Sequence, residues 1–345
     1  MKLEKSDLEN LMEQQKWSEL REFIAAWQAP EIADLLSRLE KPDRLRLFLL
    51  LPRILGGEVF SHLDPEFQES ILLELTDEEN RQLLENLQPD DRTHLLERLP
   101  GEAVQKLLNL LSPAKSQEAR QLLGYPEESV GRLMTTLYIA VRSGWTLDRA
   151  LAHIRARGRA GDSMQTIYVV DGRWHLVDAL DLQRFVLGDP GDIVEQIMDN
   201  TFVSLSPYDD REKAVEQIRR YDAVALPVVD EDGVLLGVVT VDDVMDVAEE
   251  EVTEDFQIGA GVSPLRTSYR DASAWQLYSK RMPWLLALIV IYLFASGIVG
   301  AYEETLSAQI VLASFIPMLM GSGGNVGGQS GTLTVRSLAT GELED

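Results

Sequence analysis

The sequence predicts a multidomain protein with an N-terminal all-α solenoid, a duplicated α+β module and C-terminal transmembrane α-helices. Three observations predict this order. Apolar residues recur every 24 residues between positions 31 and 124, a strand and helix pattern occurs twice between positions 131 and 250, and residues 283–302 carry no charge. The chain of 345 residues is long enough for about two or three domains.

The composition is acidic and contains no cysteine. The formal net charge is −25, which disfavours nucleic-acid binding, because phosphate neutralisation requires clustered Lys and Arg. Without cysteine there are no disulfides, thiolate metal sites or cysteine nucleophiles. Acidity suits the binding of metal cations, although in most proteins it serves solubility. The first residues, MKLEKSDLENLMEQQKW, lack the apolar core of a signal peptide.

The repeat predicts a solenoid over residues 1–130, with residues 1–30 as a helical cap. Each unit contains apolar residues at helical spacing, then a Leu-x-Pro step and a second short helix. Proline near the first turn of a helix removes only an N–H that has no partner in the helix. Because each short helix must bury its apolar face on its neighbours, the repeats are expected to stack. The residues that keep the period are Leu36, Phe60, Leu84 and Leu108, with Pro65, Pro89 and Pro113.

The duplicated module predicts two copies, at residues 131–190 and 191–250. Met134 matches Met198, Ala150 matches Ala214, and the tripeptide VVD occurs at 169–171 and again at 228–230. In the second copy we expect a strand over 198–207, a helix over 210–222, a strand over 223–230 and then a strand followed by a helix over 234–247. Runs of β-branched residues bounded by Pro, Asp and Gly support the strands.

This order of elements resembles a tandem CBS pair. The second copy carries the signature G-h-h-T-x-x-D as Gly237, Thr240 and Asp243. The resemblance implies a nucleotide site at Thr240 and Asp243, for ATP or another adenosine nucleotide. The first copy departs from the signature, with Asp178 in place of Gly and Arg184 in place of the acid. The alternative is a dimerising scaffold that binds no nucleotide.

An acidic segment follows the second copy and leads into a connector at residues 251–282. Acids at spacings of three and four residues share one face of a helix, and like charges at this spacing repel. A hard divalent cation such as Mg²⁺ would relieve this repulsion with oxygen ligands. The alternative is a solvated acidic face. The acids are Asp242, Asp243, Asp246, Glu249, Glu250, Glu251, Glu254 and Asp255.

Residues 283–345 form the predicted membrane domain. The uncharged run over 283–302 has the length of a bilayer core, and the basic residues before it place the N-terminal part in the cytoplasm. Residues 310–320 are apolar, and glycines crowd residues 321–331. Such glycines favour irregular backbone, which at membrane depth must be buried in protein or line a wet cavity. Asn325 and Gln329 are therefore expected to face a pore or, alternatively, a helix interface without an ion.

The segment PMLMGSGGNVGGQSG resembles the second transmembrane helix of MgtE-type magnesium transporters. The resemblance extends over the whole order of domains. It implies a homodimeric Mg²⁺ transporter or channel of the plasma or inner membrane, whose cytosolic part binds Mg²⁺ and closes the pore. It implies Asn325 as a pore residue, and Gly328 stands where an Asn is common. Asp90 and Asp91 match an acidic pair only loosely. The regulatory Mg²⁺ ligands implied by the resemblance are Asp210, Glu212, Asp222, Asp243, Asp246, Glu251, Glu254 and Asp255.

The resemblance also implies five transmembrane helices, so the chain would hold an incomplete membrane domain. We expect a fragment, a split-gene product whose second polypeptide supplies the missing helices, or a degenerate copy. The alternative function is a membrane-tethered sensor of adenosine nucleotide or Mg²⁺ without transport. An enzyme is not expected, because the Gly-rich stretch lacks a phosphate-loop lysine. The four histidines, at positions 62, 94, 153 and 175, also have no metal-ligand spacing.

Overall fold

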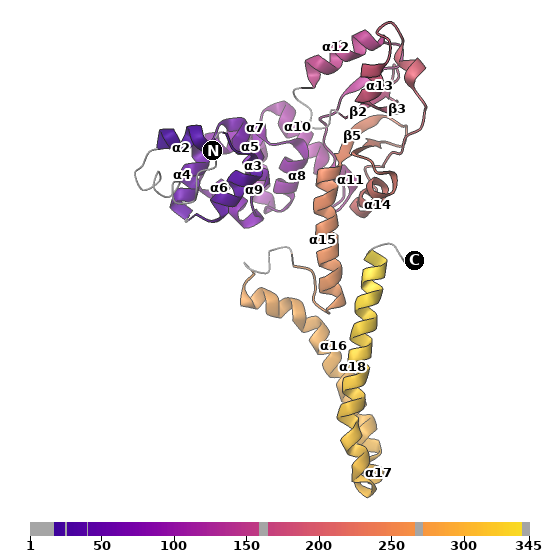
Figure 1. Ribbon diagram of the computed structural model, residues 1–345. Coiled ribbons are helices and arrows are strands. Elements are labelled where there is room, and N and C mark those ends of the chain that lie inside the picture. The colour runs from indigo at the N-terminus through magenta and orange to yellow at the C-terminus, as the bar shows by residue number, and fades with distance from the viewer. Residues whose placement is uncertain (1–16, 25, 40, 159–164, 266–271, 340–345) are drawn as a thin grey trace. The chain divides into compact units, whose positions relative to one another are not determined.

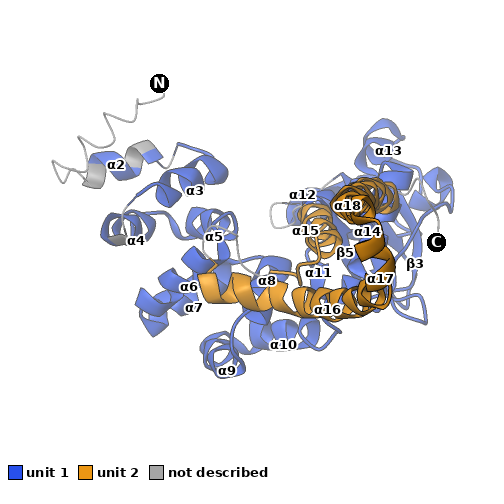
Figure 2. Cartoon of the chain, turned by 90° about the horizontal axis from the view of Figure 1, so that it is seen from below, with its two compact units in different colours: residues 1–245 blue, residues 246–345 orange. Residues whose placement is uncertain are grey.

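The computed structural model describes residues 17–24, 26–39, 41–158, 165–265 and 272–339 (Figure 1). The chain forms two compact units, residues 1–245 and residues 246–345 (Figure 2). The first unit contains the solenoid and the duplicated module, and the second contains most of helix α15 (Val241–Gly259) and the apolar helices. Residues 1–16 of the predicted cap lie outside the described residues.

Short helices stack along the solenoid, as the repeat predicts. Prolines occupy the first turns of α3, α6, α8 and α10. Leu36, Phe60, Leu84 and Leu108 lie in the core, each at most 2% exposed. The predicted α-solenoid is therefore confirmed. Its helices are α2 (Trp17–Ile24), α3 (Ala29–Ser37), α4 (Lys41–Leu49), α5 (Arg53–Ser61), α6 (Pro65–Glu74), α7 (Asp77–Asn86), α8 (Pro89–Glu97), α9 (Gly101–Leu110) and α10 (Pro113–Leu122).

Buried polar side chains cap successive helices of the solenoid. Gln68 Nε2 donates to Phe60 O over 2.7 Å, and Asn80 Nδ2 donates to Leu72 O over 3.0 Å. In the next helix, Arg92 Nη1 donates to a carbonyl that again lies eight residues earlier. The last carbonyls of a helix have no partner within that helix, so each of these side chains satisfies the end of the helix before it. We call Gln68, Asn80 and Arg92 the capping ladder.

The duplicated module follows the short helix α11 (Val130–Leu133) and consists of two α+β copies. In the first copy β1 pairs parallel with β2, and β2 pairs antiparallel with β3; in the second, β4 pairs antiparallel with β5. The bridge between His175 and Val234 links the copies. Their elements are β1 (Ala140–Arg142), α12 (Leu147–Arg157), β2 (Thr166–Val170), β3 (Leu176–Asp181), α13 (Leu182–Leu187), the 3₁₀ helix η1 (Val194–Ile197), α14 (Arg211–Tyr221), β4 (Ala225–Val229) and β5 (Leu235–Thr240).

One strand prediction in the second copy was wrong in extent. Residues 198–207 form a single parallel bridge, between Leu205 and Val228, instead of a continuous strand. Leu205, with 1% of its surface exposed, lies in the core beside β4 and forms this bridge. The residues before it run as irregular chain, and Asn200 has a positive φ of 56°, which a strand cannot accommodate.

Two long apolar helices form most of the second unit. They are α16 (Ala274–Ala301) and α18 (Ile310–Ala339), joined by α17 (Glu303–Ala308). Both are long and apolar enough to cross a membrane, with mean hydropathies of 2.3 and 1.4. The glycine-rich residues 321–331 belong to the continuous helix α18, and the irregular backbone expected there is not formed. A continuous helix satisfies its own backbone, which a bilayer demands.

Candidate metal centre

Acidic residues from two domains meet within the first unit. Asp90 and Asp91 lie in the first turn of α8, in the solenoid, and Asp242 and Asp243 lie in the first turn of α15, directly after β5. Asp90 is buried, with 8% of its surface exposed, and its charge acts on Asp243. The fold thus brings together carboxylates that are far apart in the sequence. We call Asp90, Asp91, Asp242 and Asp243 the acidic junction.

The acidic junction disfavours negative charge on Asp243. Burial, followed by the charge of Asp90, raises the pKa of Asp243 to about 9. The 2.8 Å hydrogen bond that Thr240 Oγ1 donates to Asp243 Oδ2 opposes this shift. A like charge nearby and loss of water both favour the protonated carboxyl. A cation at the junction would lower the pKa of Asp243 again, because it stabilises the carboxylate and displaces its proton.

The donor set of the junction fits a hydrated hard cation. Mg²⁺ commonly binds through one or two carboxylates and keeps several of its waters, and two carboxylates on separate elements satisfy that need. Among the described residues, no three His, Asp or Glu side chains are grouped closely enough to hold a metal ion directly.

The other predicted Mg²⁺ ligands occupy separate positions. Asp210 is the N-cap of α14, and its Oδ1 accepts a 2.9 Å hydrogen bond from the backbone N–H of Glu212. Asp222 ends the same helix with a left-handed φ of 49°. These acids therefore have local structural roles, and their metal binding stays a prediction. Metal binding also stays a prediction for the acids further along α15, which are Asp246, Glu251, Glu254 and Asp255.

The two predicted nucleotide residues contact each other. Thr240 is 5% exposed and donates a hydrogen bond to Asp243. The charge of Asp90 raises the pKa of the same Asp243 carboxyl group. Any nucleotide that used this pair would therefore act on a group of the acidic junction. Nucleotide binding by Thr240 and Asp243 stays a prediction.

The departures of the first copy from the CBS signature have structural roles. Asp178 is completely buried, and its Oδ2 accepts 3.0 Å hydrogen bonds from the backbone N–H groups of Asp199 and Asn200. Arg184 pairs with Asp199 and donates to Ile197 O. Asp178 and Arg184 together fix the segment that leads into the second copy.

The predicted pore residues lie on α18. Asn325 and Gln329 are four residues apart, so they share one face of this helix. Both are exposed in the single chain. An amide facing lipid is costly, so this face is expected to meet protein or water.

The sequence pattern does not single out the residues that join the solenoid to the first CBS copy beside the junction. Arg92, Glu118 and Thr136 form a bonded series between the solenoid and the first copy. One signal was present, because Arg44, Gln68 and Arg92 are polar at the same position of the 24-residue repeat. Polar residues at a repeated position point to a shared bonding role.

Comparison with known proteins agrees with this architecture. A family model described as the MgtE intracellular N domain matches residues 27–128, and a CBS domain model matches residues 194–250. A magnesium transporter MgtE from Thermus thermophilus is 36% identical over 94% of this chain and 73% of its own length. One of the same name from Bacillus subtilis is 29% identical over 96% of this chain and 73% of its own length.

Two solved structures resemble the cytosolic part. The cytosolic domain of the Mg²⁺ channel MgtE in complex with ATP is 34% identical, with a TM-score of 0.67, and covers 70% of this chain and 98% of its own. The soluble part of a magnesium transporter is 29% identical, with a TM-score of 0.68, and covers 71% and 97%. The predicted fold class is confirmed.

A helical solenoid, a CBS pair and apolar spanning helices together define a membrane protein with a cytosolic regulatory part. The chain belongs to the MgtE family of magnesium transporters. The predicted location, in the membrane with the N-terminal domains in the cytoplasm, is that of this family.

Proposed function

We propose that the chain is a magnesium transporter subunit whose cytosolic part senses Mg²⁺ at the acidic junction. The observation that carries the proposal is the opposition of Asp90 and Asp243 across the contact between solenoid and CBS pair. Mg²⁺ bridging Asp90 and Asp243, in part through its own water, displaces the proton from Asp243 and tightens the contact. At low cytosolic Mg²⁺, Asp243 keeps its proton, no cation bridges the two carboxyl groups, and the contact between solenoid and CBS pair is looser.

In this proposal, a displacement of Asp243 on Mg²⁺ binding is transmitted to the rest of the chain through α15. Asp243 lies in the first turn of this helix, which continues without interruption to Gly259. A shift at Asp243 therefore moves the helix that also carries the predicted ligands Asp246, Glu251, Glu254 and Asp255. In our proposal these acids add further Mg²⁺ ligands, and the transporter acts as a homodimer.

ATP is a proposed second ligand of the same region. The resemblance to an MgtE cytosolic domain in complex with ATP supports this proposal. Because Thr240 and Asp243 share a hydrogen bond, ATP binding at this pair is expected to change the affinity for Mg²⁺. Calorimetric titration of the full chain with ATP, with and without MgCl₂, measures this coupling.

Protease protection tests the Mg²⁺ proposal. The full chain in detergent is digested over a series of MgCl₂ concentrations at constant ionic strength. We expect Mg²⁺ to slow cleavage in the wild type, and Asp243→Asn and Asp90→Asn to remove this protection.

Asp232→Asn is the matched control, because it removes one exposed acid from the turn between β4 and β5 of the same domain. Its protection is expected to equal that of the wild type. Equal protection in Asp243→Asn and the wild type would show that the junction is not the sensor.

A further inference from the structure

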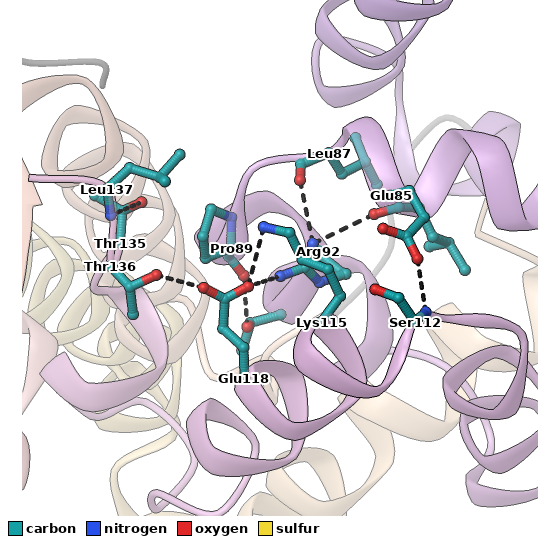
Figure 3. A network of polar contacts seen from close by, with 12 residues as sticks. Glu85, Leu87, Pro89, Arg92, Ser112, Lys115, Glu118, Thr135, Thr136 and Leu137 are labelled. Atoms are coloured by element: carbon teal, nitrogen blue, oxygen red, sulfur yellow. Dashed lines mark hydrogen bonds and ion pairs between the residues drawn. The ribbon is translucent and has the colours of Figure 1, made fainter. Parts of the chain in front are cut away.

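A second connection joins the two sides of the acidic junction without using its carboxylates. It runs from Arg92 through Glu118 to Thr136 (Figure 3). It begins at Arg92 in α8, whose side chain is completely buried. Arg92 Nη2 lies 2.6 Å from Glu118 Oε2, and Glu118 Oε1 accepts a 2.6 Å hydrogen bond from Thr136 Oγ1. Because α8 and α10 belong to the solenoid and Thr136 to the first CBS copy, Glu118 joins the two domains. We call Arg92, Glu118 and Thr136 the bracket.

The bracket ends at Thr136, whose neighbour Thr135 is bonded to the strand before Asp243. Thr135, next to Thr136, donates its N–H to Val238 O over 2.8 Å and accepts from Val238 N over 2.9 Å. Val238 lies in β5, which ends at Thr240, the hydrogen-bond partner of Asp243. On the solenoid side, Arg92 lies one turn or less from Asp90 in the same helix. The bracket therefore holds both backbones that carry the opposed acids.

Glu118 is fixed on both of its oxygens. Its Oε2 contacts Arg92 and also Lys115 Nζ at 3.2 Å, while its Oε1 contacts Thr136. Two cationic partners balance its charge, and hydrogen bonds to an ionised carboxylate are stronger than those between neutral groups. The solenoid thus holds the carboxylate of Glu118, and the Thr136 hydroxyl is the group through which the bracket crosses to the CBS pair.

The acidic junction needs such a link when no cation is bound. Without a cation, nothing bridges Asp90 and Asp243, so the two domains can move apart, and a cation site whose ligands have moved apart binds more weakly. The apparent affinity of a ligand falls in proportion to the fraction of protein in the binding-competent arrangement. A contact that keeps this arrangement populated without Mg²⁺ therefore sets the Mg²⁺ concentration of the response.

We propose that Glu118 and Thr136 are positioning residues of the Mg²⁺ sensor, and that their hydrogen bond sets its threshold concentration. This inference rests on the proposed Mg²⁺-sensing function. Thr136→Val removes the hydroxyl with little change in volume and leaves the Arg92–Glu118 pair intact. Arg132 still ties the domains in this variant, because its Nη1 contacts Glu97 Oε2 at 3.3 Å.

The test measures the Mg²⁺ midpoint of protease protection for the full chain in detergent. Thr136→Val is expected to raise the midpoint roughly fivefold or more, the lower range of coupling between sites. Thr136→Ser keeps the hydroxyl and is expected to restore the wild-type midpoint. The matched control is Thr201→Val, since Thr201 Oγ1 also donates to a carboxylate, that of Asp199, but within one CBS copy.

A distance measurement separates positioning from simple destabilisation. The chain has no cysteine, so spin labels at Glu102→Cys and Glu231→Cys report one distance between solenoid and CBS pair. Without Mg²⁺ we expect a broader distance distribution in Thr136→Val than in the wild type, and with Mg²⁺ equal widths in both. Thr136→Ala serves as the second variant if Thr136→Val does not fold.

The outcomes distinguish this inference from the function on which it rests. A wild-type chain without Mg²⁺ protection overturns the proposed function and the inference together. A wild-type chain that responds, with an unchanged midpoint and distance width in Thr136→Val, overturns the inference alone. A raised midpoint that Thr136→Ser does not restore also overturns it, because the effect then does not depend on the hydroxyl.

Discussion

Asp243 is the residue whose protonation should report on cation binding. Its pKa in the folded chain is raised to about 9, whereas in the unfolded chain it is about 4. Between these two values the folded state binds one more proton than the unfolded state. The contribution of Asp243 to the free energy of unfolding is therefore fully present below pH 4 and is lost as the pH rises through the folded pKa. Without divalent cations, we expect the free energy of unfolding to fall by up to about 1 kcal/mol per pH unit between pH 6 and 9.

Denaturant titration in EDTA measures this slope, and Asp243→Asn is expected to flatten it. Added MgCl₂ should flatten it in the wild type, because the cation displaces the proton. A slope unchanged in Asp243→Asn would assign the pH dependence to other groups, and Asp232→Asn is the control for loss of one acid.

Arg92 should contribute more to stability than any surface arginine of the solenoid. Arg92→Met leaves Leu84 O and Leu87 O without their donor and leaves Glu118 with Lys115 and Thr136. Breaking a buried charge pair costs about 3–5 kcal/mol, and we expect a loss of that size in chemical denaturation. Arg81→Met, in an exposed pair with Glu78, should cost less than about 1 kcal/mol. Equal losses would contradict a special role for Arg92.

Asp243, Asp90 and Arg92 differ in how much of their role the sequence alone could predict. The density of acids in α15 and the spacing of the CBS signature made Asp243 a predicted ligand, and its binding of Mg²⁺ or nucleotide stays a prediction. The partner of Asp243 was Asp90, matched only loosely, because the contact depends on how the solenoid packs on the CBS pair. Arg92 has the sequence appearance of a surface residue, and only its repeat position indicates burial.

At the scale of elements, each side chain of the capping ladder is expected to stabilise the C-terminal end of the helix before it. Asn80 Nδ2 donates to Leu72 O and Leu75 O, at the end of α6. Asn80→Ala removes both bonds and should lower the free energy of unfolding by about 1–3 kcal/mol, the cost of unsatisfied buried groups.

Asn86→Ala is the control within the same helix, because Asn86 is exposed and bonds only locally to Gln82 O. It should change stability by less than about 0.5 kcal/mol. Thermal unfolding of both variants distinguishes the sites, and an Asn80→Ala loss no larger than that of Asn86→Ala would contradict the ladder.

Elements with strong periodicity were predictable, and those set by context were not. The solenoid helices, α14, β4 and β5 follow from apolar spacing and turn residues. The strand expected at 198–207 is reduced to one bridge at Leu205, and Asn200, with a positive φ of 56°, interrupts the extended backbone before it. The glycine-rich part of α18 is helical, since a bilayer penalises unpaired backbone more than glycine disfavours a helix.

At the scale of the whole molecule, the amides of α18 predict association. Asn325 and Gln329 share a face that would otherwise contact lipid, at a cost that a second copy can remove. We expect light scattering of the chain in mild detergent to give twice its mass of 38.7 kDa. Asn325→Leu with Gln329→Leu should shift the mass towards one copy. A wild-type chain that stays monomeric at high concentration would contradict this prediction.

The capping ladder also bears on how the chain is made. Every ladder bond joins residues close in the sequence, so each solenoid helix can be completed soon after it leaves the ribosome. Local contacts form quickly, and N-terminal domains generally fold first during synthesis. Among the described residues, the first helix that is long and apolar enough to span a membrane begins at Ala274, well over a hundred residues after α10 ends. The solenoid is therefore expected to be folded before the translocon receives a transmembrane segment.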